Sequence, residues 1–292
     1  MSTRAGFVAV VGKPNAGKST LLNWLIGEKL AMVSHKANAT RKRALFIAMH
    51  EENQIIFIDT PGIHQKERKL NQFMLEEALK AIGDCDLILF LAPVTDGLSD
   101  YEAFLQLNPK APHILLLTKT DLVDNAKILS TIQMYQSYQD RFKALLPLSV
   151  KRGNNQIFLL NEIIKFLPIH PPLYDPEILT NIPMRELYRE FIREAIFENM
   201  SDEIPYFSDV IVEKVEETYD LEKIYATIII DKQSQKGMII GKSGTTLRRI
   251  GQNARLLIEN LCQKRVFLKL FVVVKPGWTQ NNKILKELGY LR

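Results

Sequence analysis

Apolar residues recur along this chain at strand and helix spacing, and the two patterns alternate. In the first half, apolar runs at residues 7–11, 54–58 and 113–117 are typical of strands at the buried centre of a parallel sheet. A helix after the first run is predicted from four apolar residues at helical spacing: Leu21, Leu22, Leu25 and Ile26. We therefore expect an α/β domain in which helices cover both faces of a mostly parallel sheet.

The second half has a different order of elements. We expect a helix, two strands, a pair of helices and a last strand, over residues 184–199, 209–216, 223–231, up to 262, and 266–274. This order predicts a separate α+β domain.

Prolines gather where the two patterns meet. Five of the 13 prolines lie between residues 168 and 183, and such a stretch is extended and semi-rigid. A helix through residues 163–166 precedes it, and a new apolar face begins after it at Leu187. We place the first domain at residues 1–170, a linker at 171–181 and the second domain at 182–292.

Composition limits the possible domain number, metal and disulfide content, and location of the protein. The 292 residues suffice for two domains that each bury a core. Cys85 and Cys262 lie far apart and the five histidines are scattered, so we expect neither a disulfide framework nor a His/Cys metal site. The longest apolar run, residues 87–94, is too short to span a bilayer, and no signal sequence precedes the first strand. We expect a cytoplasmic protein, with room for peripheral attachment to the inner face of the membrane.

Five nucleotide-contact signatures follow one another in the order of a GTPase. GKPNAGKS at residues 12–19 stands between a predicted strand and helix, where a phosphate-binding P-loop belongs. Thr40, DTPG at 59–62, TKTD at 118–121 and SVK at 149–151 complete the series. The candidate contacts to GTP or GDP are Gly12, Lys13, Pro14, Asn15, Ala16, Gly17, Lys18, Ser19, Thr20, Asp59, Thr60, Pro61, Gly62, Thr118, Lys119, Asp121, Ser149, Val150 and Lys151.

The chemistry of these residues predicts a Mg²⁺-dependent phosphate site. Lys18 would bridge the β- and γ-phosphates, and Ser19, Thr40 and Asp59 are the candidate Mg²⁺ ligands. Gly62 would offer its backbone N–H to the γ-phosphate. The candidate catalytic residues are Lys18, Asn15, Thr40 and Gly62.

Base selection depends on Asp121, which could accept hydrogen bonds from both N1–H and N2–H₂ of guanine. Adenine cannot make this pairing, which argues against the alternative of an ATP-using P-loop enzyme. Lys119 would cover the base plane, and Ser149 with the Val150 N–H would contact O6. The usual motif begins with Asn, and Thr118 departs from it, so the anchoring of this loop needs a different explanation.

A second motif, GxxG at residues 241–244, follows two predicted strands and precedes an amphipathic helix. With the order of elements around it, this motif resembles a type II KH domain, in which the loop backbone meets sugar-phosphate. Residues 231–292 contain 13 Lys and Arg against 3 Asp and Glu, a charge that favours nucleic acid. The candidate RNA contacts are Gly241, Lys242, Ser243, Gly244, Arg248, Arg249 and Arg255.

The two domains together resemble the bacterial Era GTPase family over nearly the whole chain. The strings EIPY at residues 203–206 and LGY at 288–290 share this resemblance. The family implies a monomeric GTP-hydrolysing switch whose KH domain binds the 3′ end of 16S rRNA and which acts in assembly of the 30S ribosomal subunit. The alternative is an RNA-binding module whose nucleotide site is mainly structural.

Ile63 occupies the position where Ras-type GTPases carry a water-orienting Gln, and an aliphatic side chain cannot orient water. The resemblance points to GTPases with a hydrophobic residue here, several of which use a P-loop Asn to help bind K⁺. Asn15 matches that residue, although Asn also suits a turn. His64 and Gln65 are the alternative groups that could reach the water.

Overall fold

The computed structural model describes residues 3–34, 36, 39–62, 69–153, 155–201 and 203–291. The chain divides into two compact units. The first unit is made of Met1–Glu28, Thr40–Gln65 and Met74–Asn181, and the second of Lys29–Ala39, Lys66–Phe73 and Ile182–Arg292. Two short segments from the first half of the sequence therefore group with the second unit.

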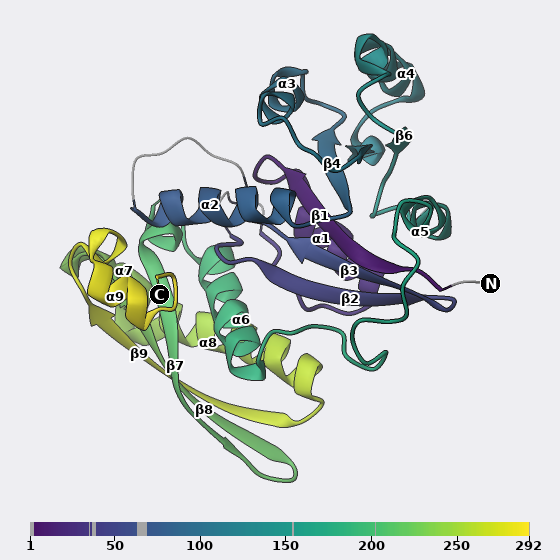
Figure 1. Cartoon of the computed structure of the whole chain (residues 1–292). Coiled ribbons are helices and arrows are strands. Elements are labelled where there is room, and N and C mark those ends of the chain that lie inside the picture. The colour runs from purple at the N-terminus through teal and green to yellow at the C-terminus, as the bar shows by residue number, and fades with distance from the viewer. Residues whose placement is uncertain are drawn as a thin grey trace. The chain divides into compact units, whose positions relative to one another are not determined.

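A six-stranded sheet in the order β2-β3-β1-β4-β5-β6 forms the first unit (Figure 1). Its strands are β1 Ala5–Gly12, β2 Ala44–His50, β3 Asn53–Asp59, β4 Leu87–Pro93, β5 His113–Thr118 and β6 Ala144–Pro147. All of them run parallel except β2, which pairs antiparallel with β3. The predicted mostly parallel sheet is confirmed, and the antiparallel edge strand is an addition to it.

Helices cover both faces of this sheet, as predicted. They are α1 Lys18–Ile26, α2 Lys69–Gly83, α3 Ser99–Gln106, α4 Asn125–Tyr135 and α5 Gln156–Ile164, with 3₁₀ turns η1 Thr120–Leu122 and η2 Gln136–Tyr138. Ala81 of α2, Tyr101 of α3 and Tyr135 of α4 share one buried cluster with Phe90 of β4. On the other face, Gln156 at the start of α5 donates to the carbonyl of Trp24 in α1 at 2.7 Å.

The proline-rich stretch is held along the β2 edge of the sheet. The Ile47 N–H donates to the carbonyl of Leu179 at 2.8 Å, and the Thr180 hydroxyl donates to the carbonyl of Leu45 at 2.7 Å. Nearer the start of the stretch, the buried side chain of Gln54 in β3 accepts from the N–H of Tyr174 at 2.9 Å and donates to the carbonyl of Tyr174 at 2.8 Å. Residues 168–181 are therefore a strap attached to the first unit rather than a free spacer.

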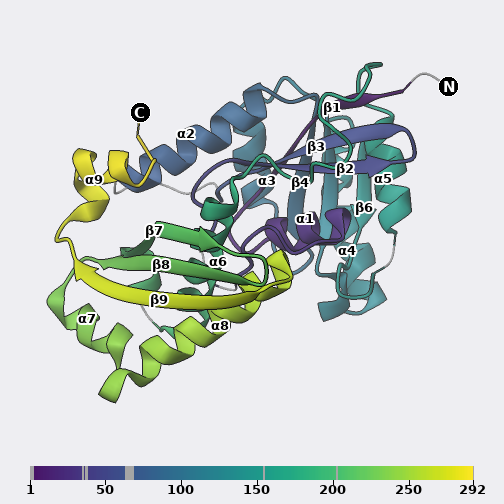
Figure 2. The same cartoon turned by 90° about the horizontal axis from the view of Figure 1, so that it is seen from below.

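The second unit has the predicted order of elements, and its first helix, α6, begins and ends at the predicted residues. Its elements are α6 Met184–Asn199, η3 Ile204–Phe207, β7 Ser208–Glu217, β8 Leu221–Ile230, α7 Gln233–Ile240, η4 Lys242–Gly244, α8 Thr245–Cys262, β9 Arg265–Val274, η5 Trp278–Gln280 and α9 Asn282–Glu287. The strands lie side by side in the order β7-β8-β9, and β9 runs parallel to β8 (Figure 2). Apolar side chains of α6, α8 and all three strands form one buried core.

The C-terminal segment after β9 returns to the start of this unit. Trp278 is fully buried, and its indole N–H donates to the carbonyl of Phe207 at 2.8 Å. The Tyr290 hydroxyl donates to Asp209 at 2.6 Å, and the same carboxylate accepts from Arg189 of α6 at 2.8 Å. A buried ion pair with a tyrosine therefore ties the end of the chain to α6 and β7, a contact that the sequence analysis does not predict.

Within the described part of the chain, no helix has both the length and the apolar character needed to cross a bilayer.

One buried histidine makes the stability of the first unit depend on pH. His113, 4% exposed, shares a 2.8 Å hydrogen bond with the Tyr101 hydroxyl, and burial lowers its pKa to about 4. The unfolded chain binds a proton near pH 6.5, so between pH 6.5 and 4 the unfolded state holds more protons than the folded state. We expect the free energy of unfolding to fall with acidification in that window, by at most about 1.4 kcal/mol per pH unit.

Chemical denaturation of wild type and His113→Gln between pH 4 and 7 tests this expectation. The variant should lose the His113 part of the pH dependence, whereas the exposed His170→Gln should keep it. Parallel pH profiles for wild type and His113→Gln would contradict the assignment.

Candidate functional site

The P-loop lies between the end of β1 and the start of α1, as the motif predicts. A Cβ atom at Gly12 would stand 2.7 Å from the carbonyl oxygen of Leu91, so only glycine fits there. Lys18 is 7% exposed, and its ammonium donates to the carbonyls of Gly12 at 3.0 Å and Lys13 at 2.9 Å. Burial lowers the pKa of Lys18 to about 8, against the opposing charge of Asp59. Among the described residues, the hydrogen bonds of this buried cation go to carbonyl oxygens, so it gains strongly from an anionic ligand.

Three oxygen-bearing side chains meet beside Lys18. The Ser19 and Thr40 hydroxyls lie 3.3 Å apart, and they stand 3.4 and 3.3 Å from Oδ2 of Asp59. Asp59 is 2% exposed, and burial raises its pKa to about 6 despite the nearby Lys18 charge. Its Oδ1 is buried without a hydrogen-bond partner in the described structure. Two hydroxyls, a carboxylate and a spare buried oxygen fit a hydrated Mg²⁺, which prefers oxygen ligands and takes few from protein.

The DTPG segment after β3 is fixed against the P-loop. The Thr60 hydroxyl donates to the carbonyl of Val10 in β1 at 2.7 Å. A Cβ atom at Gly62 would stand 2.7 Å from Cγ of Pro14, so the backbone of Gly62 lies directly on the P-loop. Ile63, His64 and Gln65, on which the water-orienting hypotheses rest, lie outside the described residues.

The predicted base-binding residues lie at the end of β5 and in the segments that follow β5 and β6. The Thr118 hydroxyl donates to the carbonyl of Ala16 in the P-loop at 2.8 Å. Thr118, which replaces the usual Asn of this motif, therefore still anchors the base-binding segment to the P-loop. The Ser149 hydroxyl donates to Oδ1 of Asp121 at 2.7 Å and lowers the pKa of that carboxyl. In this structure Ser149 orients Asp121, a role that the sequence analysis does not assign to it.

The acidic partners of Lys13 were not predicted from the sequence. Its ammonium lies 2.7 Å from Asp96 and 3.6 Å from Asp100, and the hydrogen bond with Asp96 raises the pKa of Lys13. This ion pair links the P-loop to the segment that leads from β4 into α3. The only signal in the sequence is the pair of acidic residues shortly after a buried strand.

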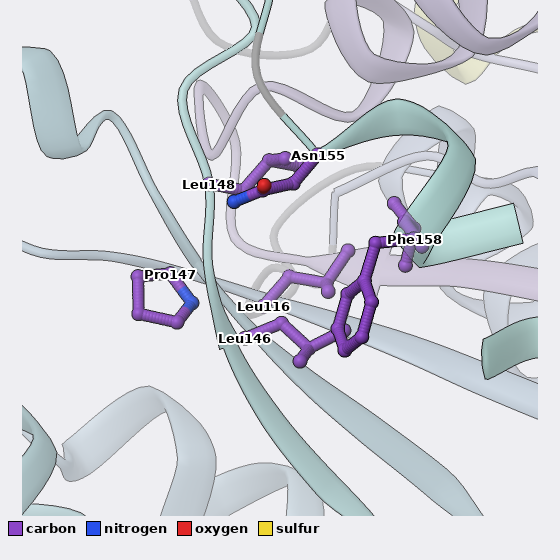
Figure 3. Close-up of a pocket in the computed structure, with 7 residues that line it drawn as sticks. Leu116, Leu146, Pro147, Leu148, Asn155 and Phe158 are labelled. Atoms are coloured by element: carbon purple, nitrogen blue, oxygen red, sulfur yellow. The ribbon is translucent and has the colours of Figure 1, made fainter. Parts of the chain in front are cut away.

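An apolar pocket of about 220 Å³ lies elsewhere in the first unit (Figure 3). Its lining comes from β5, β6, α5 and the segment between β6 and α5, and consists of Leu116, Leu146, Pro147, Leu148, Asn155, Phe158 and Leu159. It includes no P-loop residue and only one polar side chain, so it has no groups to hold a phosphate.

The GxxG motif forms the predicted loop between two helices. A Cβ atom at Gly241, where φ is +73°, would stand 2.3 Å from the Thr246 hydroxyl oxygen, so glycine is required. Lys242 and Ser243 are exposed, and α8 begins directly after Gly244. The loop therefore offers a cation, a hydroxyl and a helix N-terminus to an anion.

The three predicted arginines of α8 have different surroundings. Arg248 and Arg255 are exposed, and Arg255 lies 3.8 Å from Glu259. Arg249 reaches the carbonyl of Asn199 at the end of α6 at 3.4 Å. Within the described part of the chain Arg248 makes no ion pair or hydrogen bond through its side chain, whereas Arg249 also serves the packing of α6.

An aromatic and basic stripe on β9 was not predicted. Phe267 and Phe271 are 49% and 44% exposed, and the Lys269 ammonium lies 5.3 Å from the centroid of the Phe271 ring. These residues alternate with the buried core positions of the strand, so one face of β9 carries them all.

Comparison with known proteins agrees with both units. The family model described as 50S ribosome-binding GTPase matches residues 7–119, and the KH domain model matches residues 203–279. The GTPase Era of Campylobacter concisus is 54% identical over 98% of this chain and 100% of its own length. The GTPase Era of Helicobacter pylori is 49% identical over 100% of this chain and 98% of its own.

Two solved structures have the same fold over nearly the whole chain. One is an Aquifex aeolicus Era variant bound to GDP and AlF₄⁻, and the other is Era in complex with MgGDPNP and nucleotides 1506–1542 of 16S ribosomal RNA. Each has a TM-score of 0.94 at 33% identity and covers 99% of this chain and 100% of its own. With a GTPase unit, a KH unit and relatives this similar over its full length, the chain belongs to the Era family of GTPases.

Proposed function

We propose that this GTPase is a switch whose KH domain binds the 3′ end of 16S rRNA during assembly of the 30S ribosomal subunit. The observation that carries the proposal is the exposed GxxG loop at the N-terminus of α8, in a chain that matches an Era–rRNA complex from end to end. Because 16S rRNA is the RNA of the small subunit, that complex favours the 30S particle as the partner.

The geometry supports the proposed role of each part of the nucleotide site. Lys18 would bind the phosphates, Ser19 and Thr40 would hold Mg²⁺, and Asp59 would accept from the waters around it. A bound Mg²⁺ would neutralise charge on the transferring phosphoryl group. The backbone of Gly62 lies against the P-loop, and its N–H would donate a hydrogen bond to the γ-phosphate.

At the other end of the nucleotide, Asp121 would select guanine because its carboxylate is ionised and oriented by Ser149. A carboxylate in that position disfavours ATP, the alternative substrate.

The same proposal covers where the protein acts. We propose a monomer in the cytoplasm. The basic C-terminal part, 13 Lys and Arg against 3 Asp and Glu in residues 231–292, is also the part that an anionic membrane surface would attract.

Thr118→Val tests the anchor between the base-binding segment and the P-loop. The change removes the 2.8 Å hydrogen bond to Ala16 and leaves the Ala16 carbonyl unpaired, so GTP and GDP should both bind more weakly, by about 1 kcal/mol or roughly fivefold. Equilibrium titration with fluorescent GTP and GDP measures both affinities. The matched control is Thr218→Val, whose hydroxyl donates to Leu221 in the second unit. A loss confined to GTP would contradict a role at the base end.

Lys242→Asp with Ser243→Asp tests the RNA interface. Like-charge repulsion against phosphate should weaken binding of a 16S rRNA fragment that covers nucleotides 1506–1542 by about tenfold or more, and the salt dependence should fall by about one counterion per lost contact. GTP affinity should not change. The double variant Lys127→Asp with Ser130→Asp makes the same change on exposed positions of α4 and should keep RNA affinity. Equal RNA affinity for both double variants would reject the GxxG interface.

A further prediction concerns K⁺. If Asn15 helps to hold K⁺ at the phosphates, GTP turnover should be faster in K⁺ than in Na⁺ at equal ionic strength, and Asn15→Gly should remove the difference. Glycine is the suitable substitution because Asn15 has φ +62°, and Asn108→Gly, at φ +49°, is the control. Ile63→Ala should change turnover little. Identical phosphate-release rates in the two salts would remove the role of Asn15.

A further inference from the structure

The outer strand of the second unit, β9, has one face in the core and one face exposed. Its even-numbered residues, such as Val266 and Val272, belong to the buried core that α6 and α8 complete. Its odd-numbered residues, from Arg265 to Val273, are all exposed. Successive residues of a strand point to opposite faces, so the exposed positions form one row on the face of the sheet that α8 does not cover (Figure 2).

This row carries two phenyl rings with a cation between them. Phe267 and Phe271 are each about half exposed, and the ammonium of Lys269 lies 5.3 Å from the centroid of the Phe271 ring. On the neighbouring strand β8, Tyr225 is the register partner of Lys269, and its ring lies edge-to-face with Phe267 at 6.4 Å between centroids. We name Tyr225, Phe267, Lys269 and Phe271 the aromatic face.

The charge of this part of the chain favours an anionic partner. Residues 263–286 contain six Lys and Arg and no Asp or Glu. Arg265, at the start of β9, pairs with the exposed Asp220, and such a surface pair is weak. Among the described residues the Lys269 ammonium pairs with no carboxylate, and its contact is the Phe271 ring. Its charge is therefore available to a phosphate.

Two acidic side chains of β7, the third strand of the sheet, already have partners. Glu213 accepts from the Thr227 hydroxyl at 2.6 Å, and Glu216 lies 2.5 Å from the Lys214 ammonium. These contacts offset the acidic charge near the aromatic face, and the charged side chains of β9 itself are all cations.

Aromatic rings on a sheet with a cation between them fit unpaired nucleotides. RNA bases stack on exposed aromatic side chains of RNA-binding sheets, and Lys or Arg meets the phosphates. Phe267 and Phe271 stand about 13 Å apart along the strand, so they take two separate bases and leave Lys269 for the phosphate between them. A second copy of this chain would bring a face of the same charge against β9, which disfavours self-association.

We propose that the aromatic face is a second RNA-binding surface of this unit, which takes unpaired nucleotides of the rRNA by base stacking. The GxxG loop lies at the start of α8, and α8 packs on the opposite face of the sheet. The two surfaces are therefore distinct. This inference rests on the proposed binding of 16S rRNA by the KH domain and adds a second point of contact to it.

Phe267→Leu with Phe271→Leu is the first test, because leucine keeps an apolar side chain on the strand and removes the ring. Affinity for the RNA fragment of nucleotides 1506–1542 should fall by about tenfold or more. The salt dependence should not change, because a ring releases no counterion, whereas the variant with Lys242→Asp and Ser243→Asp lowers both. Fluorescence anisotropy at several salt concentrations measures both quantities.

The matched control is Tyr219→Leu, which removes a ring that is 98% exposed in the turn between β7 and β8. It should bind the fragment as wild type does. GTP affinity should be the same in all of these variants, since each change lies in the second unit.

Lys269→Gln tests the cation of the aromatic face without touching a ring. Both the affinity and the salt dependence should fall, the latter by about one counterion, and Lys269→Arg should restore them. Lys127→Gln, the same change at an exposed position of α4, is the control and should have no effect. RNA affinity equal to wild type in both the phenylalanine double variant and Lys269→Gln overturns the proposal.

Two further outcomes identify what has failed. If the variant with Lys242→Asp and Ser243→Asp weakens RNA binding and the aromatic-face variants do not, only the second surface fails. If wild type does not bind the fragment, the proposed rRNA function fails and the second surface fails with it. A wild-type dimer in sedimentation that the phenylalanine double variant dissociates also overturns the proposal, because the face then joins two copies of the chain.

Discussion

The nucleotide site depends on one constraint: parallel neighbouring strands end at the same edge of a sheet. β1 leads into the P-loop, β3 ends at Asp59, β5 ends at Thr118 and the segment after β6 contains Ser149. Residues more than a hundred positions apart in the sequence therefore meet, as in the hydrogen bond from Thr118 to Ala16. An antiparallel pairing of these strands would send half of the site to the opposite edge.

The buried charged side chains of the two units differ in how completely they are paired. In the second unit Arg189 and Asp209 satisfy each other, with Tyr290 on the remaining carboxylate oxygen, and the pKa of Arg189 is raised well above its ordinary value. In the first unit the balance is incomplete, because the pKa of Lys18 is lowered and Oδ1 of Asp59 has no hydrogen-bond partner among the described residues. Removal of one partner from a completed buried pair destabilises the fold, whereas an incomplete pair gains its missing partners when a ligand arrives.

Much of the site could be predicted because its motifs are local. Gly12 to Ser19 and Gly241 to Gly244 each form a turn that glycine and a following helix determine, and the strands before them are apolar enough to recognise. The contacts that were missed join residues distant in sequence: Ser149 with Asp121, Lys13 with Asp96, and Tyr290 with Asp209. No periodicity marks such pairs. The position of the strap was not predicted for a related reason, since prolines predict an extended chain but not the strand edge along which it lies.

That strap has a consequence for association between copies of the chain. A bare strand edge presents unpaired N–H and C=O groups that can recruit another polypeptide. Leu179 and Thr180 occupy such groups along β2, and the Asn181 side chain accepts from the Leu45 N–H at 3.2 Å. The opposite edge, β6, is only four residues long and ends in Pro147, which has no N–H to offer. A fragment that stopped before residue 168 would keep the P-loop and every residue predicted to contact the nucleotide, but its β2 edge would be open to intermolecular pairing.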